Sequence, residues 1–269
     1  MIEIYEKWFA GYTAGVRSRI SCDSFEFADE RQANLEEVDL KIEHSYRVRD
    51  RALEIAKSEK LGERDLELAA IIGLFHDLGR FQQALNFGTM DDRITGLHGE
   101  LSADVFMESA PKENFSPQEV EVIADSLRCH NLFKVPDGLN GRSLFFTRLI
   151  RDADKLDIFQ FYSEIARDKG NQARGFRFIM STESAIKGEC TPELLAGVLR
   201  GENLNVGSIR NSNDRKLVQL SMVFNLNFTY SYQWLLEKGY LADIIGTGSK
   251  DLMRAYEYVV EWMKSMMKI

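Results

Sequence analysis

The sequence predicts an all-α fold. Its 269 residues include only 4 prolines, and no segment alternates β-branched with polar residues as a half-buried strand does. Apolar residues recur instead at the three- and four-residue spacings of amphipathic helices. Hydrophobic residues make up 44% and charged residues 28% of the chain, which is usual for globular proteins that bury a core.

An N-terminal helix and a connecting segment are expected over residues 1–37. The part from Ser21 to Glu37 is polar and acidic, so it is predicted to form a loop or a lid. The next helix is predicted from about Leu40 to Lys60. One face of this helix carries four residues at helical spacing, namely His44, Val48, Ala52 and Ile55.

A histidine-aspartate pair, His76-Asp77, follows an apolar helix that begins near Glu63. Gly79 is the expected stop of this helix, because glycine readily adopts the conformation that ends helices. A polar loop that contains glycine is predicted from Asn86 to Gly96. His98 is then expected to open another helix.

The clearest helix start follows Ser116. Pro117 suits the first helical position, and Glu119 completes a capping box with Ser116. The apolar stripe of this helix ends at His130. A further helix, roughly residues 143–166, places Asp154 on the same face as apolar side chains, so the pattern buries a carboxylate.

The last third of the chain contains no histidine and is expected to form more helices, over residues 191–200, 214–238 and 249–267. Gly201 and Gly239 follow the first two as predicted caps. The aromatic residues of this part are interpreted as core or as a dimer face, so a homodimer is one expected assembly. They are Phe224, Phe228, Tyr232 and Trp234.

Composition excludes several classes of function. A net charge of −8 gives no overall attraction to nucleic-acid phosphates, so a polymer partner is not expected. The longest apolar run, Leu68 to Phe75, is far shorter than the roughly 18 residues of a membrane span. The first residues lack a secretion signal, so a cytoplasmic protein is expected. The three cysteines are odd in number and far apart, which argues against a disulfide framework and a thiolate zinc site.

The histidines are the strongest indication of chemistry. All four lie between positions 44 and 130, each at or near the end of an apolar helical face, and Asp77 and Asp154 occupy comparable places. A single histidine on such a face is more often part of the core. Imidazoles and carboxylates that converge from several helices are, however, the usual way in which a helical bundle holds divalent metal ions.

The order of these residues resembles the HD superfamily of metal-dependent phosphohydrolases. The resemblance rests on His44, the His76-Asp77 doublet, and Asp154 within the segment Arg151 to Asp157. The added His98 and His130 resemble the branch with two metals. That branch includes dinucleoside-polyphosphate hydrolases, cyclic-dinucleotide phosphodiesterases and di-iron oxygenases. The chain lacks the Gly-Tyr-Pro element of the cyclic-dinucleotide group, and Asn131 follows His130, so cyclic dinucleotides are not the first expectation.

The resemblance covers about residues 38–165, which are therefore the predicted catalytic core. It implies an HD-domain helical bundle, with residues 166–269 as a C-terminal helical extension packed on it. It also implies two divalent metal ions, with Fe or Mn as the first expectation and Zn, Ni, Co or Mg as alternatives. Activity would come from a hydroxide shared by the two ions.

The ligands can be assigned to the two ions on this basis. We assign Asp77 as the bridging carboxylate, with one ion held by His44, His76 and Asp154 and the other by His98 and His130. Consecutive helical residues point about 100° apart. His76 and Asp77 are thus not expected to act on one face as a single chelate. The alternative is one ion, with His98 or His130 contacting its ligands or the substrate.

Substrate phosphate also requires positive charge. Arg80, just after the doublet, is the first candidate and is assigned with Asp77 to catalysis. Arg47 and Arg151 lie one turn from His44 and Asp154 and are weaker candidates, which could equally pair with carboxylates of the site.

The resulting expectation is hydrolysis of a phosphomonoester or phosphodiester of a small, nucleotide-like substrate. A mixed-valent di-iron oxygenase is the leading alternative, because the same six ligands serve both chemistries in the superfamily. A metal-binding signalling module without turnover is the second alternative.

Overall fold

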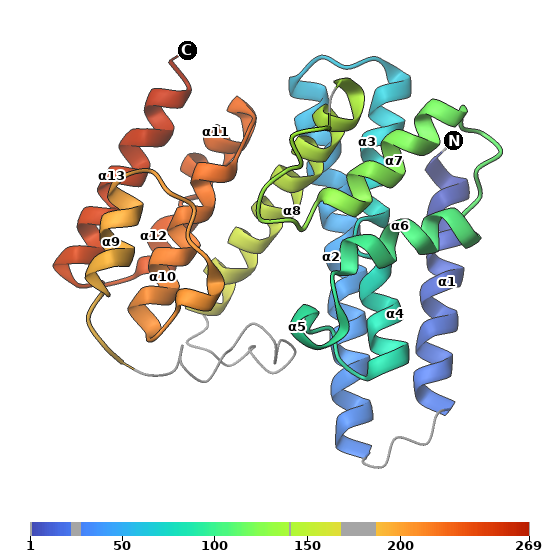
Figure 1. The fold of residues 1–269 in the computed structure, drawn as a ribbon, viewed down its shortest axis with the longest axis horizontal. Helices are drawn as coiled ribbons and strands as arrows, with labels where there is room; N and C mark the ends of the chain where they lie inside the picture. Colours follow the sequence, from blue (N-terminus) through green and yellow to red (C-terminus); the bar gives the residue numbers. More distant parts are fainter. Residues whose placement is uncertain (1, 23–27, 140, 168–186, 269) are drawn as a thin grey trace. The chain divides into compact units, whose positions relative to one another are not determined.

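The computed structural model describes residues 2–22, 28–139, 141–167 and 187–268, and these residues form helices and connecting turns without a strand (Figure 1). The predicted all-α fold is confirmed. No helix of this described part is long and apolar enough to cross a membrane.

Two compact units make up the chain, Met1–Asp154 and Lys155–Ile269. The predicted metal ligands all belong to the first unit. Its helices are α1 (Ile2–Cys22), α2 (Ala28–Ser58), α3 (Glu63–Phe75), α4 (Leu78–Phe87), α5 (Asp92–Thr95), α6 (His98–Ser109), α7 (Pro117–Cys129) and the first half of α8 (Gly141–Arg167).

Helix α3 lies in the middle of the first unit and is buried continuously from Leu68 to Phe75. It contacts α1, α2 and α7, and a helix covered on several sides needs apolar residues around its whole circumference. At its end, Phe75 meets Phe9 of α1 and Phe106 of α6, all fully buried. The aromatic core of the unit therefore lies next to His76.

Helix α2 is longer than predicted. It begins at Ala28, and α1 ends at Cys22, so the predicted loop or lid is wrong over residues 21–22 and 28–37, and residues 23–27 lie outside the described part. Polarity alone was a poor guide here, because the residues of this segment include alanine, glutamate, glutamine and arginine, which are good helix formers. Val38 is fully buried, so the helix already contributes to the core six residues before His44.

Gly79 does not stop a helix, contrary to the prediction. Helix α3 already ends at Phe75, and Gly79 lies inside α4, which follows after a two-residue break. A Cβ atom on Gly79 would lie 2.2 Å from the carbonyl oxygen of His98 and 2.8 Å from the backbone nitrogen of Ser102. The backbone N–H of Gly79 donates to the hydroxyl of Ser102 at 2.9 Å. The absence of a side chain thus lets α4 touch α6 where His98 begins.

The substitution Gly79→Ala is expected to destabilise the protein by about 1–3 kcal/mol, since the added methyl meets backbone atoms that cannot turn aside. The matched control is Gly15→Ala in α1, where a Cβ would meet nothing within 4 Å. It is expected to stabilise by about 0.5–1 kcal/mol. Urea unfolding of both variants checks the pair, and a Gly79→Ala protein as stable as the parent would contradict the close-packing role.

The first turns of helices α3 and α7 contact each other, and so do the residues that follow their last turns. The predicted capping box is confirmed, since Ser116 accepts from the backbone of Glu119 and the Glu119 carboxylate accepts from the backbone of Ser116. The same carboxylate accepts two hydrogen bonds, at 2.6 and 2.8 Å, from Arg64 in the first turn of α3. The Arg64 guanidinium lowers the pKa of Glu119 to about 2. Both helices are 13 residues long, so their last turns also lie at the same level.

The second unit contains the remaining helices: the second half of α8, then α9 (Pro192–Leu199), α10 (Ser212–Ser221), α11 (Thr229–Lys238), α12 (Tyr240–Ile245) and α13 (Lys250–Met266). The predicted single helix over 214–238 is wrong, because the chain leaves helical geometry at Leu226. Asn227 there donates its side-chain amide to the carbonyl of Asn225, a local bond that competes with helix formation. Phe228, Tyr232 and Trp234 are buried, as expected for core aromatics.

Candidate metal centre

His76 and His130 occupy equivalent positions at the ends of α3 and α7. Each is the residue that directly follows the last helical residue. Each also donates its ring Nδ1–H to the carbonyl oxygen three residues earlier, to Gly73 at 2.8 Å and to Leu127 at 2.7 Å. A carbonyl can only accept, so these bonds place the proton on Nδ1 and leave a lone pair on Nε2. The two ring centroids lie 5.2 Å apart.

Two further histidines face this pair. His44, from the middle of α2, brings its Nε2 to 3.1 Å from Nε2 of His76. His98, the first residue of α6, brings its Nε2 to 3.0 Å from Nε2 of His130. All four side chains are buried. The four imidazoles therefore form two pairs, each with its Nε2 atoms turned toward one another.

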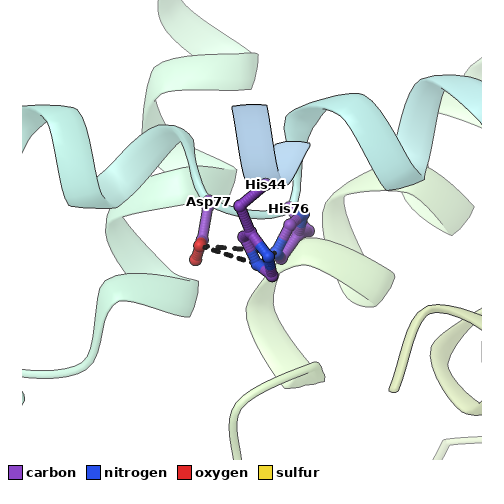
Figure 2. A group of neighbouring side chains, drawn as sticks. All are labelled: His44, His76 and Asp77. Carbon is purple, nitrogen blue, oxygen red and sulfur yellow. Dashed lines mark hydrogen bonds and ion pairs between the residues drawn. The ribbon is translucent and has the colours of Figure 1, made fainter. Parts of the chain in front are cut away.

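Asp77 lies between the two pairs and presents a different oxygen to each. Its Oδ2 is 3.5 Å from Nε2 of His44 and 3.4 Å from Nε2 of His76. Its Oδ1 is 3.3 Å from Nε2 of His98 and 3.8 Å from Nε2 of His130. Figure 2 shows Asp77 turned toward His44 and His76. These distances are those expected if Asp77 bridges two ions.

The ligand atoms of His76 and Asp77 do lie on one side of the chain, 3.4 Å apart, contrary to the sequence-based argument. That argument assumed a continuous helix, whereas α3 ends at Phe75 and α4 begins at Leu78. Asp77 has φ −103° and ψ 18°, between the helical and extended regions. The short break turns the carboxylate back toward the ring of His76. The doublet and His44 therefore form one group of potential ligands, and Asp77, His98 and His130 form a second.

Asp154 lies beside the first pair. Its Oδ1 is 3.2 Å from Nε2 of His44 and 3.8 Å from Nε2 of His76. Burial alone would raise the pKa of Asp154, but the neighbouring rings of His44 and His76 hold it well below the usual value. The structure therefore brings all six predicted ligands together, with Asp154 on the side to which it was assigned.

The donor atoms fit divalent ions. With the protons on Nδ1, the facing Nε2 atoms of His98 and His130 are both acceptors, as neither can donate to the other. Two nitrogens bound at right angles to one ion at about 2.1 Å would lie about 3.0 Å apart. The observed separations of 3.0 and 3.1 Å match this spacing. Imidazole and carboxylate donors without thiolate suit Fe, Mn and Zn ions.

Asp92 is a functional candidate that sequence reasoning missed. It lies in the first turn of α5, and its carboxylate accepts from Nδ1 of His98 at 2.8 and 2.9 Å. Arg80 and Gln83 donate to the same carboxylate. Burial raises the pKa of Asp92, but the hydrogen bond from His98 and the charge of Arg80 lower it to about 2. Asp92 precedes His98 by six residues and lies in a predicted loop, so helical periodicity could not predict that the two side chains meet.

Lys41 was also missed, although a signal was present. It precedes His44 by three residues on α2, and this spacing places both on one helix face. Its ammonium group donates to Oδ2 of Asp77 at 2.7 Å. Burial would raise the pKa of Asp77, but Lys41 and His76 hold it well below the usual value. The cations predicted for the site from the sequence are all arginines.

The three arginines predicted to bind phosphate are engaged with the protein. Arg80 donates to the carbonyl of Met90 and the carboxylate of Asp92. Arg151 is buried, and its guanidinium donates to main-chain carbonyls that follow α7, including that of His130. Arg151 therefore stabilises the end of α7. Arg47 lies partly exposed on α2, 3.7 Å from Glu43. Their binding to a substrate stays a prediction.

The metal-free protein is expected to lose stability as the pH falls below about 6.5. Burial, aided by the charge of Arg80, lowers the pKa of His98 to about 3, and burial also lowers that of His76. The unfolded chain binds these protons at about pH 6.5 and the folded chain does not. The free energy of unfolding therefore drops by up to about 1.4 kcal/mol per pH unit for each histidine. Urea titrations in EDTA at pH 7.5 and pH 5 measure this, and equal stability at both would contradict it.

Comparison with protein-family models matches residues 42–158 to the HD domain. No match was found among curated proteins or among solved structures. The matched segment begins two residues before His44 and ends four residues after Asp154, so it contains the six converging side chains. The chain therefore carries an HD domain, the domain that defines the superfamily of metal-dependent phosphohydrolases.

Proposed function

We propose that the HD domain hydrolyses a phosphomonoester or phosphodiester of a small, nucleotide-like molecule with the help of two divalent ions. The observation that carries this proposal is the placement of Asp77. One carboxylate oxygen faces each histidine pair. A shared carboxylate between two sets of nitrogen donors suits a pair of ions close enough to act on one phosphate.

The ions would supply an activated water at neutral pH and neutralise negative charge on the phosphate oxygens. The chain itself holds the donors in place. Main-chain carbonyls orient His76 and His130, and Asp92 orients His98. Because the side chains are buried and held by these hydrogen bonds, little reorganisation is needed when charge develops. The net charge of −8 supports a small substrate over a nucleic-acid polymer.

The test uses the purified chain, stripped with EDTA and reloaded anaerobically with Mn²⁺ or Fe²⁺. A panel of nucleoside phosphates, dinucleoside polyphosphates and aryl phosphates is incubated with each form, and products are measured by chromatography. We expect metal-dependent release of phosphate or nucleotide without oxygen. The variant Asp77→Asn serves as the inactive control.

The same experiment separates the two alternatives. Product formation only with Fe²⁺, accompanied by oxygen consumption, would replace the hydrolase with a di-iron oxygenase. Tight binding of metal without turnover of any member of the panel, with or without oxygen, would favour a signalling module.

A further inference from the structure

Lys41 is a buried cation at the centre of the candidate metal site. It lies on α2, one turn before His44, and is 9% exposed. Its Nζ is 2.7 Å from Oδ2 of Asp77, the oxygen that also faces His44 and His76. The ammonium therefore lies beside the carboxylate that both histidine pairs share.

A site that served only to hold cations would gain nothing from this lysine. A positive charge this close to a shared carboxylate repels an incoming divalent ion, and it does so strongly in a buried site, where the effective dielectric constant is low. Removing an ammonium group from water is also unfavourable unless the group has a partner. A role other than metal binding would account for the position of Lys41.

Two of the arginines near the site are held by other groups of the protein. Arg80 is tied to Asp92 and the carbonyl of Met90, and Arg151 to carbonyls after α7. Lys41 instead carries a compact ammonium on a flexible four-carbon stem with three donors. Such a group can exchange one anionic partner for another without movement of the backbone.

From this geometry we infer that Lys41 binds a phosphate oxygen of the substrate. Its Nζ pairs with Oδ2 of Asp77, and the flexible stem would let the same ammonium reach an anion bound next to this carboxylate. This inference rests on the proposed function, since it names the group that recognises the phosphate. It adds a phosphate contact on α2 to those predicted for the arginines.

The test compares Lys41→Met, Lys41→Gln and Lys41→Arg with the parent chain. Lys57→Gln, an exposed lysine on the same helix, is the matched control. Mn²⁺ affinity is measured by calorimetry in the absence of substrate. Binding of inorganic phosphate to the Mn²⁺-loaded proteins is then measured from the broadening of the ³¹P signal. Glutamine can still donate a hydrogen bond to Asp77, so this variant keeps the test usable if methionine impairs folding.

We expect Lys41→Met and Lys41→Gln to bind Mn²⁺ at least as tightly as the parent and inorganic phosphate at least 10-fold more weakly. Lys41→Arg should retain part of the phosphate affinity, and Lys57→Gln all of it. Unchanged phosphate binding in the uncharged variants would overturn the inference. So would a loss of Mn²⁺ binding with no effect on phosphate, because Lys41 would then only position Asp77.

Failure of the inference and failure of the proposed function give different results. If phosphate binding depends on Lys41 but no ester is turned over, the inference stands and hydrolysis is wrong. If esters are hydrolysed while phosphate binding ignores Lys41, hydrolysis stands and the inference is wrong.

Discussion

Replacing Asp77 with asparagine is expected to remove both ions and to lower any metal-dependent turnover by at least about 1000-fold, equivalent to about 4 kcal/mol of transition-state stabilisation. The physical reason is that each carboxylate oxygen faces a different histidine pair. An amide offers one neutral oxygen, and its NH₂ group repels a cation. Metal content by elemental analysis and rates with the best substrate of the panel measure the effect.

The control for this prediction is Asp104→Asn, an exposed aspartate on α6. It removes the same charge from the same unit without touching the site, so metal content and rate should match the parent. An Asp77→Asn protein that still binds two ions would show that Asp77 does not bridge them.

The same substitution has a separate consequence without metal. The Asp77→Asn change would leave the buried Lys41 ammonium without its carboxylate, and breaking one side of a buried ion pair costs about 3–5 kcal/mol. Urea unfolding in EDTA should show this loss. Adding Lys41→Met should restore part of it, because the double variant no longer buries an unpaired charge.

Most helices and all six converging side chains could be predicted from the sequence. Helical spacing places His44 and Asp154 on buried faces, and the capping box of Ser116 and Glu119 marks the start of α7. Helical spacing and capping boxes depend on residues close together in the sequence, so they can be recognised without knowledge of tertiary contacts. Family order then adds the expectation that the side chains converge.

The contacts that were missed depend on how helices are rotated and joined. The break between α3 and α4, which turns Asp77 toward His76, involves only two residues. The close approach of Gly79 to α6 has no counterpart in the local sequence, which predicts only a helix end at this glycine. Asp92, which contacts His98, also accepts hydrogen bonds from Arg80 and Gln83, and all of these contacts join residues of different helices. Helical periodicity describes one helix at a time and therefore does not predict contacts between helices.

Replacing Asp92 is expected to have the second large effect, a loss of metal affinity. His76 and His130 are oriented by main-chain carbonyls, which substitution cannot remove. His98 is oriented by side chains, chiefly by Asp92 at 2.8 Å and also by Asn131 at 3.1 Å, so the contribution of Asp92 can be tested by substitution. Losing a carboxylate that holds a metal-binding histidine typically lowers metal affinity 10- to 100-fold. Asp92→Ala should therefore weaken the ion held by His98 and His130 by about that factor.

The ion held by His44, His76 and Asp154 should keep its affinity in Asp92→Ala, because none of these three contacts Asp92. Calorimetry with Mn²⁺ should then separate one tight site from one weakened site. Asp91→Ala is the matched control, since Asp91 caps α5 and pairs with Arg93. If both variants weaken the same ion equally, the position of α5 matters and not the hydrogen bond to His98. If neither does, His98 needs no carboxylate to bind its ion.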